Sequence, residues 1–276
     1  MDPIIKWAGG KSWAVSYIKE LVTSDMLAAG TFIEPFCGGA AITLAITPKK
    51  ILLGDSNLEL INLYLVASHH PEELINKLRS MQDQHSKDFF YEVRALDRNP
   101  EFNNITPIDR AARFVYLNKT CFNGLYRVNS KGFFNTPIGR SSSGKPIDIV
   151  QADKIREFAK YCTNIHNSVN FICADYLEVM ARAKSGDIVV LDPPYTQTNH
   201  TSYQKEGFTW EDTKKLKAEC DRLNALGCHI IIFNEGTPEV KELFSNYEIQ
   251  EISTKRTISC KGDNRKASEV LITNII

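Results

Sequence analysis

The spacing of apolar and polar positions divides the chain into short apolar runs and longer segments with helical periodicity. An apolar run bounded by glycine, proline or acidic residues is typical of a buried strand. Such runs lie at residues 31–34, 50–54, 169–173, 187–191, 228–233, 248–252 and 269–275. Apolar positions at helical spacing lie between them, at residues 14–22, 153–161 and 209–226. This alternation of strands and helices predicts an α/β fold built on one sheet.

The alternation is interrupted between residues 58 and 165. Helical spacing is found there at residues 58–66, 72–81, 110–117 and, in part, 83–105. Residues 125–135 predict a β-hairpin about the turn Ser130-Lys131-Gly132. We therefore expect residues 1–57 and 166–276 to form the α/β domain. Residues 58–165 are expected to form an inserted, mostly helical subdomain that contains the hairpin.

Composition narrows the class of protein. Of the 276 residues, 43% are apolar and 24% are charged, which is ordinary for a soluble globular protein with a sizeable core. The seven cysteines are scattered and form no C-x-x-C pair, which argues against a disulfide framework and a zinc site. No apolar run approaches the length of about 18 residues that a membrane helix needs. No signal peptide is visible, so we expect a cytoplasmic protein without a membrane segment or a metal.

Charge is distributed unevenly, although the formal net charge is zero. Residues 110–147 contain no acidic residue and seven basic ones, namely Arg110, Arg113, Lys119, Arg127, Lys131, Arg140 and Lys145. A second basic group near the C-terminus contains Lys255, Arg256, Lys261, Arg265 and Lys266, opposed only by Asp263. A charge run is usually a solvated face, but aromatic and asparagine residues are interleaved with the first one. That combination indicates contact with a nucleic acid.

Residues 31–57 have the order of a nucleotide-binding half-domain, which is strand, glycine turn, helix, strand and acid. The glycines let the backbone approach a ligand, and Asp55 can accept both hydroxyls of a ribose or, alternatively, cap the next helix. The phosphate-binding pattern G-x-G-x-x-G and a Walker lysine are absent. The pocket therefore suits an adenosyl group without a pyrophosphate, and S-adenosyl-L-methionine fits better than NAD or ATP. Trp7 and Lys11 flank Gly9-Gly10 and are candidates for the pocket wall, the alternative for Trp7 being a core residue.

The apolar run at residues 188–191 ends in Asp192-Pro193-Pro194-Tyr195. The prolines cannot continue a central strand, because they have no N–H to give the ladder. The turn therefore holds a carboxylate, a carbonyl and an aromatic face at the carboxyl edge of the sheet, where such folds bind ligands. A carboxylate beside a carbonyl can accept both hydrogens of an exocyclic amino group, and the ring can stack on the base. The alternative is a proline turn that only ends the strand, with Asp192 as a cap.

Four stretches together resemble the Dam-type (D12 class) site-specific DNA adenine-N6 methyltransferases, at residues 6–11, 34–40, 116–127 and 192–195. The resemblance covers nearly the whole chain. It implies a Rossmann-like, S-adenosylmethionine-dependent catalytic domain at residues 1–57 and 166–276, with a DNA-recognition subdomain at 58–165. The implied reaction moves a methyl group from S-adenosyl-L-methionine to the N6 amino group of an adenine flipped out of double-stranded DNA. We expect a monomer that acts in a bacterial or phage-infected cell.

The resemblance also assigns roles to individual residues. Catalytic roles fall on Asp192, Pro193 and Tyr195. Cofactor contacts fall on Trp7, Lys11, Glu34, Phe36, Gly38, Asp55, Asp175 and Asp192. DNA contacts fall on Lys6, Asn123, Leu125, Arg127, Asn129 and Pro137. Among these, Arg127 would read a guanine in the major groove, and Leu125 would fill the gap left by the extruded base. A polar segment at residues 196–207 is expected to be a lid that carries Tyr203.

The chain departs from the family pattern at three positions. Ala40 replaces the last glycine of the loop, Phe133 replaces an acidic residue, and Ser141 replaces an aromatic residue. The last two changes fall among the expected contacts to the outer bases. GATC is therefore the expected recognition site, and another short site that contains adenine is the alternative. A cytosine-N4 or RNA methyltransferase would share the chemistry of the tetrapeptide and is a second alternative.

Overall fold

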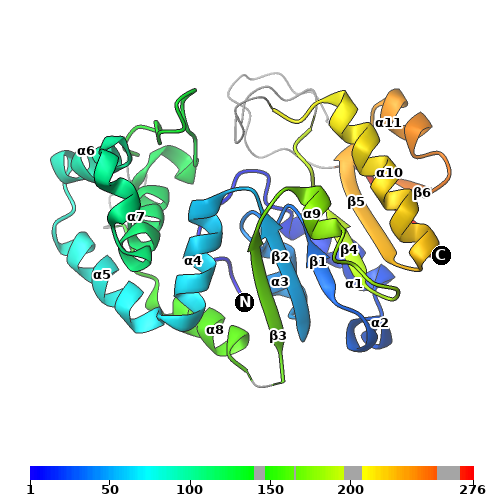
Figure 1. Ribbon diagram of the computed structural model, residues 1–276, viewed down its shortest axis with the longest axis horizontal. Coiled ribbons are helices and arrows are strands. Elements are labelled where there is room, and N and C mark those ends of the chain that lie inside the picture. The colour runs from blue at the N-terminus through cyan, green and yellow to red at the C-terminus, as the bar shows by residue number, and fades with distance from the viewer. Residues whose placement is uncertain (140–146, 165, 196–206, 254–267) are drawn as a thin grey trace.

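The protein is built around a seven-stranded, mostly parallel sheet (Figure 1). The computed structural model describes residues 1–139, 147–164, 166–195, 207–253 and 268–276. The strands are β1 (Phe32–Glu34), β2 (Lys50–Asp55), β3 (Ser168–Cys173), β4 (Ile188–Leu191), β5 (His229–Glu235), β6 (Glu248–Ser253) and β7 (Ser268–Thr273). Their spatial order is β3-β2-β1-β4-β5-β7-β6, in which β7 runs antiparallel to both of its neighbours. The predicted α/β sheet is confirmed.

The helices fall into two groups in sequence. Those that accompany the strands are α1 (Val15–Leu21), α2 (Ser24–Ala29), α3 (Ala41–Ile46), α9 (Tyr176–Met180), α10 (Trp210–Leu226) and α11 (Pro238–Leu243). The others are α4 (Leu58–His69), α5 (Pro71–Asp83), α6 (Lys87–Ala95), α7 (Pro107–Thr120) and α8 (Ala152–Cys162). Helices α2, α9 and α11 were not predicted from the sequence. Each has five or six residues, which is too short to display a helical period of apolar positions.

The central strands are buried on both faces, and their side chains divide between two cores. Ile188 and Val190 of β4 belong to the core on one side of the sheet, whereas Val189 and Leu191 belong to the core on the other. All four are at most 2% exposed. This division follows from the alternation of side chains along a strand. It explains why the strand is a continuous apolar run rather than an alternating one.

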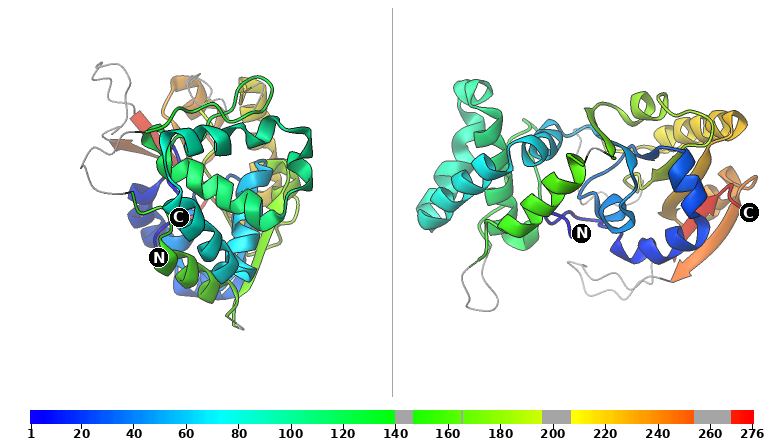
Figure 2. Two further views of the ribbon diagram at one scale, coloured as in Figure 1. Left: turned by 90° about the vertical axis from the view of Figure 1, so that its left-hand side faces the viewer. Right: turned by 90° about the horizontal axis from the view of Figure 1, so that it is seen from below.

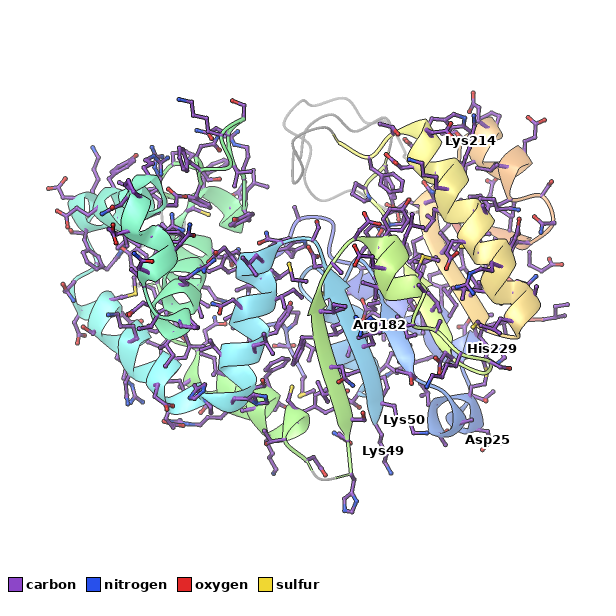
Figure 3. All side chains as sticks on the ribbon, viewed as in Figure 1. Asp25, Lys49, Lys50, Arg182, Lys214 and His229 are labelled. Carbon is purple, nitrogen blue, oxygen red and sulfur yellow. The ribbon has the colours of Figure 1, made fainter. Side chains whose placement is uncertain are left out.

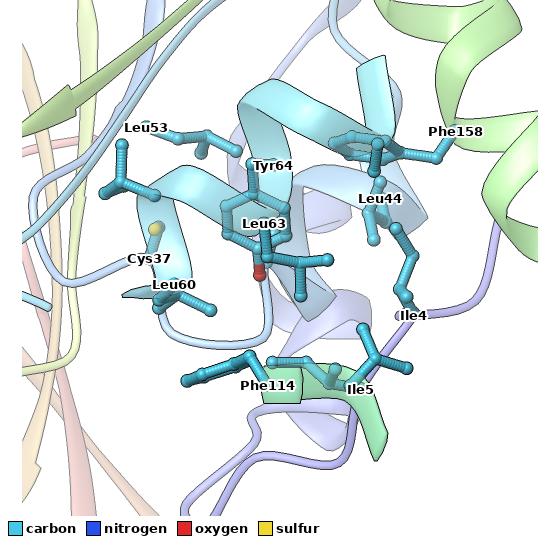
Figure 4. Packing of buried hydrophobic residues seen from close by; sticks show 14 of the residues in the cluster. Ile4, Ile5, Cys37, Leu44, Leu53, Leu60, Leu63, Tyr64, Phe114 and Phe158 are labelled. Atoms are coloured by element: carbon cyan, nitrogen blue, oxygen red, sulfur yellow. The ribbon is translucent and has the colours of Figure 1, made fainter. Parts of the chain in front are cut away.

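The second group of helices lies to one side of the sheet, as both Figure 1 and Figure 2 show. These helices share one core with the adjacent face of the sheet. Figure 4 shows Tyr64 of α4 between Leu53 of β2 and Phe158 of α8. The Tyr64 and Phe158 ring centroids are 5.6 Å apart. The division of the chain into two domains stays a prediction, because the apolar core is continuous across it.

The direction of the parallel strands shows which end of the sheet is expected to bind ligands. Figure 3 shows Lys49 and Lys50, where β2 begins, and His229, where β5 begins, at the lower end of the sheet. The carboxyl ends of the strands therefore lie at the upper end. The chain runs from β1 outward to β2 and β3, and from β4 outward to β5. A parallel sheet whose strand order reverses in this way binds ligands at the carboxyl edge between the two halves.

None of the helices that the structure describes is long and apolar enough to span a lipid bilayer.

Replacing Tyr64 by Phe tests how strongly the helices support the edge of the sheet. The Tyr64 hydroxyl donates a hydrogen bond to the backbone carbonyl of Gly38, in the turn after β1. We expect the variant to lose about 1–3 kcal/mol of unfolding free energy, because a buried acceptor is left unpaired. Urea denaturation should show a lower midpoint with an unchanged slope. Tyr17→Phe is the matched control, since its hydroxyl has no partner among the described residues, and an equal loss there would contradict the explanation.

Candidate functional site

A pocket of about 420 Å³ lies at the carboxyl edge of the sheet. Its volume is within the range of small-molecule and cofactor sites, roughly 300–1,000 Å³. The walls include all of the residues predicted to contact a cofactor or to act in catalysis, namely Trp7, Lys11, Glu34, Phe36, Gly38, Asp55, Asp175, Asp192, Pro193 and Tyr195. The structure therefore brings together residues from five separate stretches of the sequence.

The glycine turn forms the floor of the pocket. Gly38 has a positive φ of 45°, and a methyl group added to it would lie 2.6 Å from the Trp7 ring. Its N–H donates to Asp55 Oδ2 at 3.1 Å, while the Asn57 N–H donates to Asp55 Oδ1 at 2.9 Å. Ala40, which replaces the last glycine of the family pattern, adopts φ 53° and keeps the turn. Trp7 can therefore approach the backbone of this turn closely, and so can a ligand in the pocket.

Asp55 was open to two interpretations, and the structure assigns the cap to its neighbour. Asn57 is the residue that caps α4, because its Oδ1 accepts hydrogen bonds from the N–H groups of Glu59 and Leu60. Asp55 instead lies at the end of β2, lines the pocket, and holds the glycine turn. Burial raises the pKa of its carboxyl group. Each carboxylate oxygen that accepts one N–H retains a second lone pair for a ligand.

Trp7 serves as both a packing residue and a wall of the pocket. Its ring stacks with Tyr126 at a centroid distance of 5.9 Å and with Phe114 of α7 at 6.3 Å. It also lies against Gly38 and lines the pocket. The two interpretations of Trp7 that the sequence left open are therefore compatible.

Three aromatic rings that line the pocket pack against one another. Phe36 stacks on Tyr176 with a centroid distance of 5.1 Å and an interplanar angle of 25°, and Phe208 packs against both rings. Asp175 lies beside them, where its Oδ1 accepts the Leu177 N–H at the start of α9. The sequence analysis identified Phe36 and Asp175 but not Tyr176. A tyrosine that opens a five-residue helix gives no periodic signal.

Glu34 is a buried carboxyl at the end of β1. The N–H and hydroxyl groups of Thr43 both donate to its Oε1. Burial raises the pKa of Glu34 to about 7, despite these hydrogen bonds. The group can therefore present either a carboxylate or a carboxylic acid to the pocket near neutral pH.

The predicted catalytic residues are joined by a buried lysine. Lys11 is 6% exposed, and its Nζ lies 2.7 Å from the Tyr195 hydroxyl and 3.1 Å from Asp192 Oδ1. The Nζ also lies 4.9 Å from the centroid of the Tyr195 ring. Burial raises the pKa of Asp192 to about 6, and the charge of Lys11 opposes that rise.

Two acceptors beside Lys11 remain open to a ligand. Asp192 Oδ2 and the Pro193 carbonyl receive no hydrogen bond from any residue that the structure describes. The Asp192 side chain is 24% exposed and therefore reachable from the pocket. The prediction that these two acceptors receive the two hydrogens of an amino group therefore stays open to test.

The residues predicted to contact DNA lie on and around a tight turn next to the pocket. The predicted hairpin is present as a turn with one isolated bridge, between Val128 and Phe134, rather than as two extended strands. Asn129 Oδ1 closes the turn by accepting the N–H groups of Lys131 and Phe133. The predicted contacts Lys6, Asn123, Arg127 and Pro137 are exposed, and Leu125 is half-buried. Asn129 therefore has a structural task that the sequence analysis did not foresee.

Asn118 fastens this surface to the wall of the pocket. Its Oδ1 accepts the Lys6 N–H at 2.9 Å, and its Nδ2 donates to the carbonyls of Lys6 and Gly124 at 2.8 and 2.9 Å. Gly124 has a φ of 67°, and a methyl group there would lie 2.8 Å from the Lys6 side chain. Asn118 directly follows the largely apolar segment at residues 114–117 of α7, and a polar residue at that place is the signal that could have identified it.

The basic stretch is less available to a partner than its sequence suggests. Arg110 pairs with Glu59, buried Arg113 pairs with Asp97 at 2.9 Å, and Lys119 donates to Gln151 at 2.8 Å. Burial and the nearby charge of Lys154 lower the pKa of Lys119 to about 8. The interpretation of the whole run as a nucleic-acid surface was therefore too broad. Among its described residues, Arg127 and Lys131 are the exposed basic ones.

Asp97 anchors the turn from behind. Its Oδ2 accepts the Phe134 N–H at 2.7 Å and lies 2.9 Å from Arg113 Nη2. Arg98 donates to the Phe134 carbonyl at 2.7 Å, and its guanidinium lies 5.5 Å from the Phe133 ring. The turn is thus held through both the N–H group and the carbonyl group of Phe134. No local pattern in the sequence predicts this, because the partners are 36 and 37 positions apart.

Some of the predicted features lie outside the residues that the structure describes. These are Tyr203 in the predicted lid, Ser141, Arg140, Lys145, and the terminal group of Lys255, Arg256, Lys261, Arg265 and Lys266. Within the described ranges, no three His, Cys, Asp or Glu side chains are grouped as a metal site would require.

Comparison with known proteins gives one consistent result. The family model described as D12 class N6 adenine-specific DNA methyltransferase matches residues 7–258. Type II methyltransferase M1.LlaDCHI of Lactococcus lactis subsp. cremoris is 35% identical over 279 residues, which cover 99% of this chain and 95% of that protein. Type II methyltransferase M.MjaIII of Methanocaldococcus jannaschii is 33% identical over 294 residues, with 99% of both chains covered. DNA adenine methylase of Escherichia coli strain K12 is 30% identical over 276 residues, covering 97% and 93%.

Replacing Lys11 by Met tests the electrostatic coupling in the site. Lys11 lowers the pKa of Asp192, so its removal should raise that pKa above about 6. Carbon-13 NMR titration of the aspartate carboxyl groups measures this directly, with Asp192→Asn identifying the signal. Lys49→Met is the control, because Lys49 lies at the other end of the sheet (Figure 3). An Asp192 signal that titrates at the same or a lower pH in Lys11→Met would contradict the coupling.

Proposed function

Because the chain belongs to the D12 class N6 adenine-specific DNA methyltransferase family, we propose that it transfers the methyl group of S-adenosyl-L-methionine to the N6 atom of a flipped adenine in double-stranded DNA. The observation that carries the proposal is the pair of open acceptors, Asp192 Oδ2 and the Pro193 carbonyl, next to Tyr195. Family membership favours adenine over the alternatives of cytosine-N4 and RNA. GATC is the proposed site, with another short adenine site as the alternative.

The chemistry of the residues that line the pocket supports S-adenosyl-L-methionine as the cofactor. Asp55 at the end of β2 offers carboxylate oxygens to the ribose hydroxyls, and Gly38 lets the backbone approach the ligand closely. The stacked rings of Phe36 and Tyr176 form an apolar wall for the adenine, with Asp175 beside it as an acceptor. When bound, this cofactor supplies a methyl group that its sulfonium already activates.

The chain's own residues overcome the weak nucleophilicity of the target nitrogen. The lone pair of adenine N6 is delocalised into the ring, so the nitrogen attacks poorly in water. Asp192 Oδ2 and the Pro193 carbonyl would accept its two N–H groups and stabilise the positive charge that develops as the new bond forms. Tyr195, held by Lys11, would stack on the base and orient it. Because Asp192 must be ionised for this, the rate should fall as the pH drops below about 6.

An adenine inside a duplex cannot reach this pocket, so base flipping is part of the proposal. The surface beside the pocket carries suitable groups. Phe122 is 51% exposed on the 3₁₀ turn Phe122–Gly124, directly before Asn123. Together with the half-buried Leu125 it offers apolar groups that could replace the extruded base in the stack.

Arg127 is the proposed reader of a guanine. Its Nε donates to Asn135 Oδ1 at 2.7 Å, which fixes the plane of the guanidinium. Its terminal amino groups have no partner among the described residues, so both can donate to a base edge. Phe133 replaces the acidic residue of the family and packs under Arg98. The contact to an outer base is therefore the part of the GATC proposal with the least support.

The direct test is methylation of duplex DNA with labelled S-adenosyl-L-methionine, followed by mapping of the modified bases. We expect N6-methyladenine at GATC. Label at another adenine site would select the alternative site, and label on cytosine, or on RNA alone, would refute the proposed reaction.

Replacing Asp192 by Asn tests the catalytic role. We expect the rate of transfer to fall by roughly 10²–10³-fold, because an amide cannot match the charge that develops on N6. DNA affinity should stay within a few fold of wild type. Asp221→Asn on α10 is the control, since Asp221 pairs with Lys217 and Tyr247 outside the pocket. Near-normal transfer by Asp192→Asn would rule out the mechanism.

Replacing Arg127 by Ala tests sequence reading. We expect a loss of about 1–3 kcal/mol in discrimination at one base pair, with methylation spreading to sites that differ there. Lys131→Ala on the same turn is the matched control, because a phosphate contact weakens binding to all sequences alike and reduces its salt dependence. Uniform weakening in both variants would assign Arg127 to the backbone instead.

A further inference from the structure

We propose that Glu269 on β7 is a positioning residue, whose carboxylate restrains Lys11 so that one oxygen of Asp192 stays open to the target amino group. The inference rests on the proposed function and adds a residue to it. Glu269 does not line the pocket and belongs to none of the four stretches that carry the family resemblance.

The Nζ of Lys11 lies near three oxygen atoms, two from the turn after β4 and one from β7. Its Nζ lies 2.7 Å from Tyr195, 3.1 Å from Asp192 Oδ1 and 3.7 Å from Glu269 Oε2. Tyr195 and Asp192 follow β4, whereas Glu269 lies on β7, beyond β5 in the sheet. Lys11 thus experiences attraction from two sides. Without Glu269, the ammonium group would be free to move onto both oxygens of Asp192 and occupy the acceptor that the adenine needs.

The burial of Glu269 argues against a purely structural role. The residue is 5% exposed, and its Oε2 receives no hydrogen bond within the described part of the chain. Its cross-strand neighbour in the register of β5 and β7 is Glu235, whose Oε2 is also buried without a hydrogen bond. Like charges opposite each other, and buried acceptors without donors, both disfavour the folded state. Lys11 is the described cation that compensates Glu269.

The charges around Asp192 make the proposal testable through its titration. Three charged groups act on the Asp192 carboxyl or respond to it, namely Lys11, Glu269 and Glu34, and Tyr195 shares Lys11 with it. Burial raises the pKa of Asp192 most, Lys11 lowers it, and Glu269 raises it. Removing the Glu269 charge therefore lowers the pKa of Asp192. Loss of Glu269 also allows Lys11 to move closer to Asp192, which lowers the pKa of Asp192 further.

The test compares Glu269→Gln and Glu269→Leu with Glu235→Gln. Carbon-13 NMR titration without cofactor or DNA should show the Asp192 carboxyl titrating at lower pH in both Glu269 variants. In methylation assays the acid limb of kcat/KM should move to lower pH as well. The value of kcat should fall about tenfold or more in Glu269→Leu and less in Glu269→Gln, whose amide oxygen can still accept from Lys11. Glu235→Gln should leave kcat within about twofold, because Glu235 does not contact Lys11.

The outcomes separate this inference from the proposed function. An Asp192 titration that stays in place or moves to higher pH in the Glu269 variants would overturn the inference, as would an unchanged kcat. A structural role alone would lower the amount of folded protein, measured by thermal melting, without moving the titration. If the wild-type protein methylates no adenine but the NMR shift appears, the electrostatic coupling of Glu269 to Asp192 stands and the proposed reaction fails.

Discussion

The ammonium group of Lys11 is the contact on which the candidate site depends. It is buried, and it joins the loop near the N-terminus to the turn after β4 and to the start of β7. A buried ammonium is costly to desolvate, and here the carboxylates of Asp192 and Glu269 and the Tyr195 hydroxyl approach it. The arrangement gives the Asp192 carboxyl an environment in which ionisation near neutral pH is sensitive to small changes of charge. The Tyr195 hydroxyl and the Asp192 carboxylate are both positioned by contact with this one group.

The parts of the structure that could be predicted from the sequence are those that local patterns encode. Apolar runs identified the strands, since a buried parallel strand must be apolar on both faces. The carboxyl-edge position of Asp192 and Asp55 followed from the strands that precede them. The family match confirms the adenine-specific assignment that the four motifs suggested. The roles of individual residues stay predictions, although the structure does place them around one pocket.

The parts that could not be predicted depend on contacts between distant residues. The sequence does not show whether a basic side chain points to solvent or into the core, so Arg113 could not be recognised as the buried partner of Asp97. Asn118 and Glu269 act through backbone or ionic contacts to segments more than a hundred positions away. The extent of the hairpin was overestimated for a related reason. Besides two backbone hydrogen bonds across it, its turn is held by Asp97 and Arg98 in the 3₁₀ turn Leu96–Arg98 that follows α6.

The clamp made by Asn118 has a consequence for how two ligands would bind. The residues that it holds, Lys6 and Gly124, adjoin the pocket wall at Trp7 on one side and the exposed surface around Asn123 on the other. A ligand that orders the pocket wall therefore also orders the surface around Asn123, and the second ligand then loses less conformational entropy on binding. Under the proposed function, cofactor and DNA are thermodynamically linked, and each should increase the affinity for the other by the same factor. A single asparagine side chain would then couple the two binding events, whichever ligand binds first.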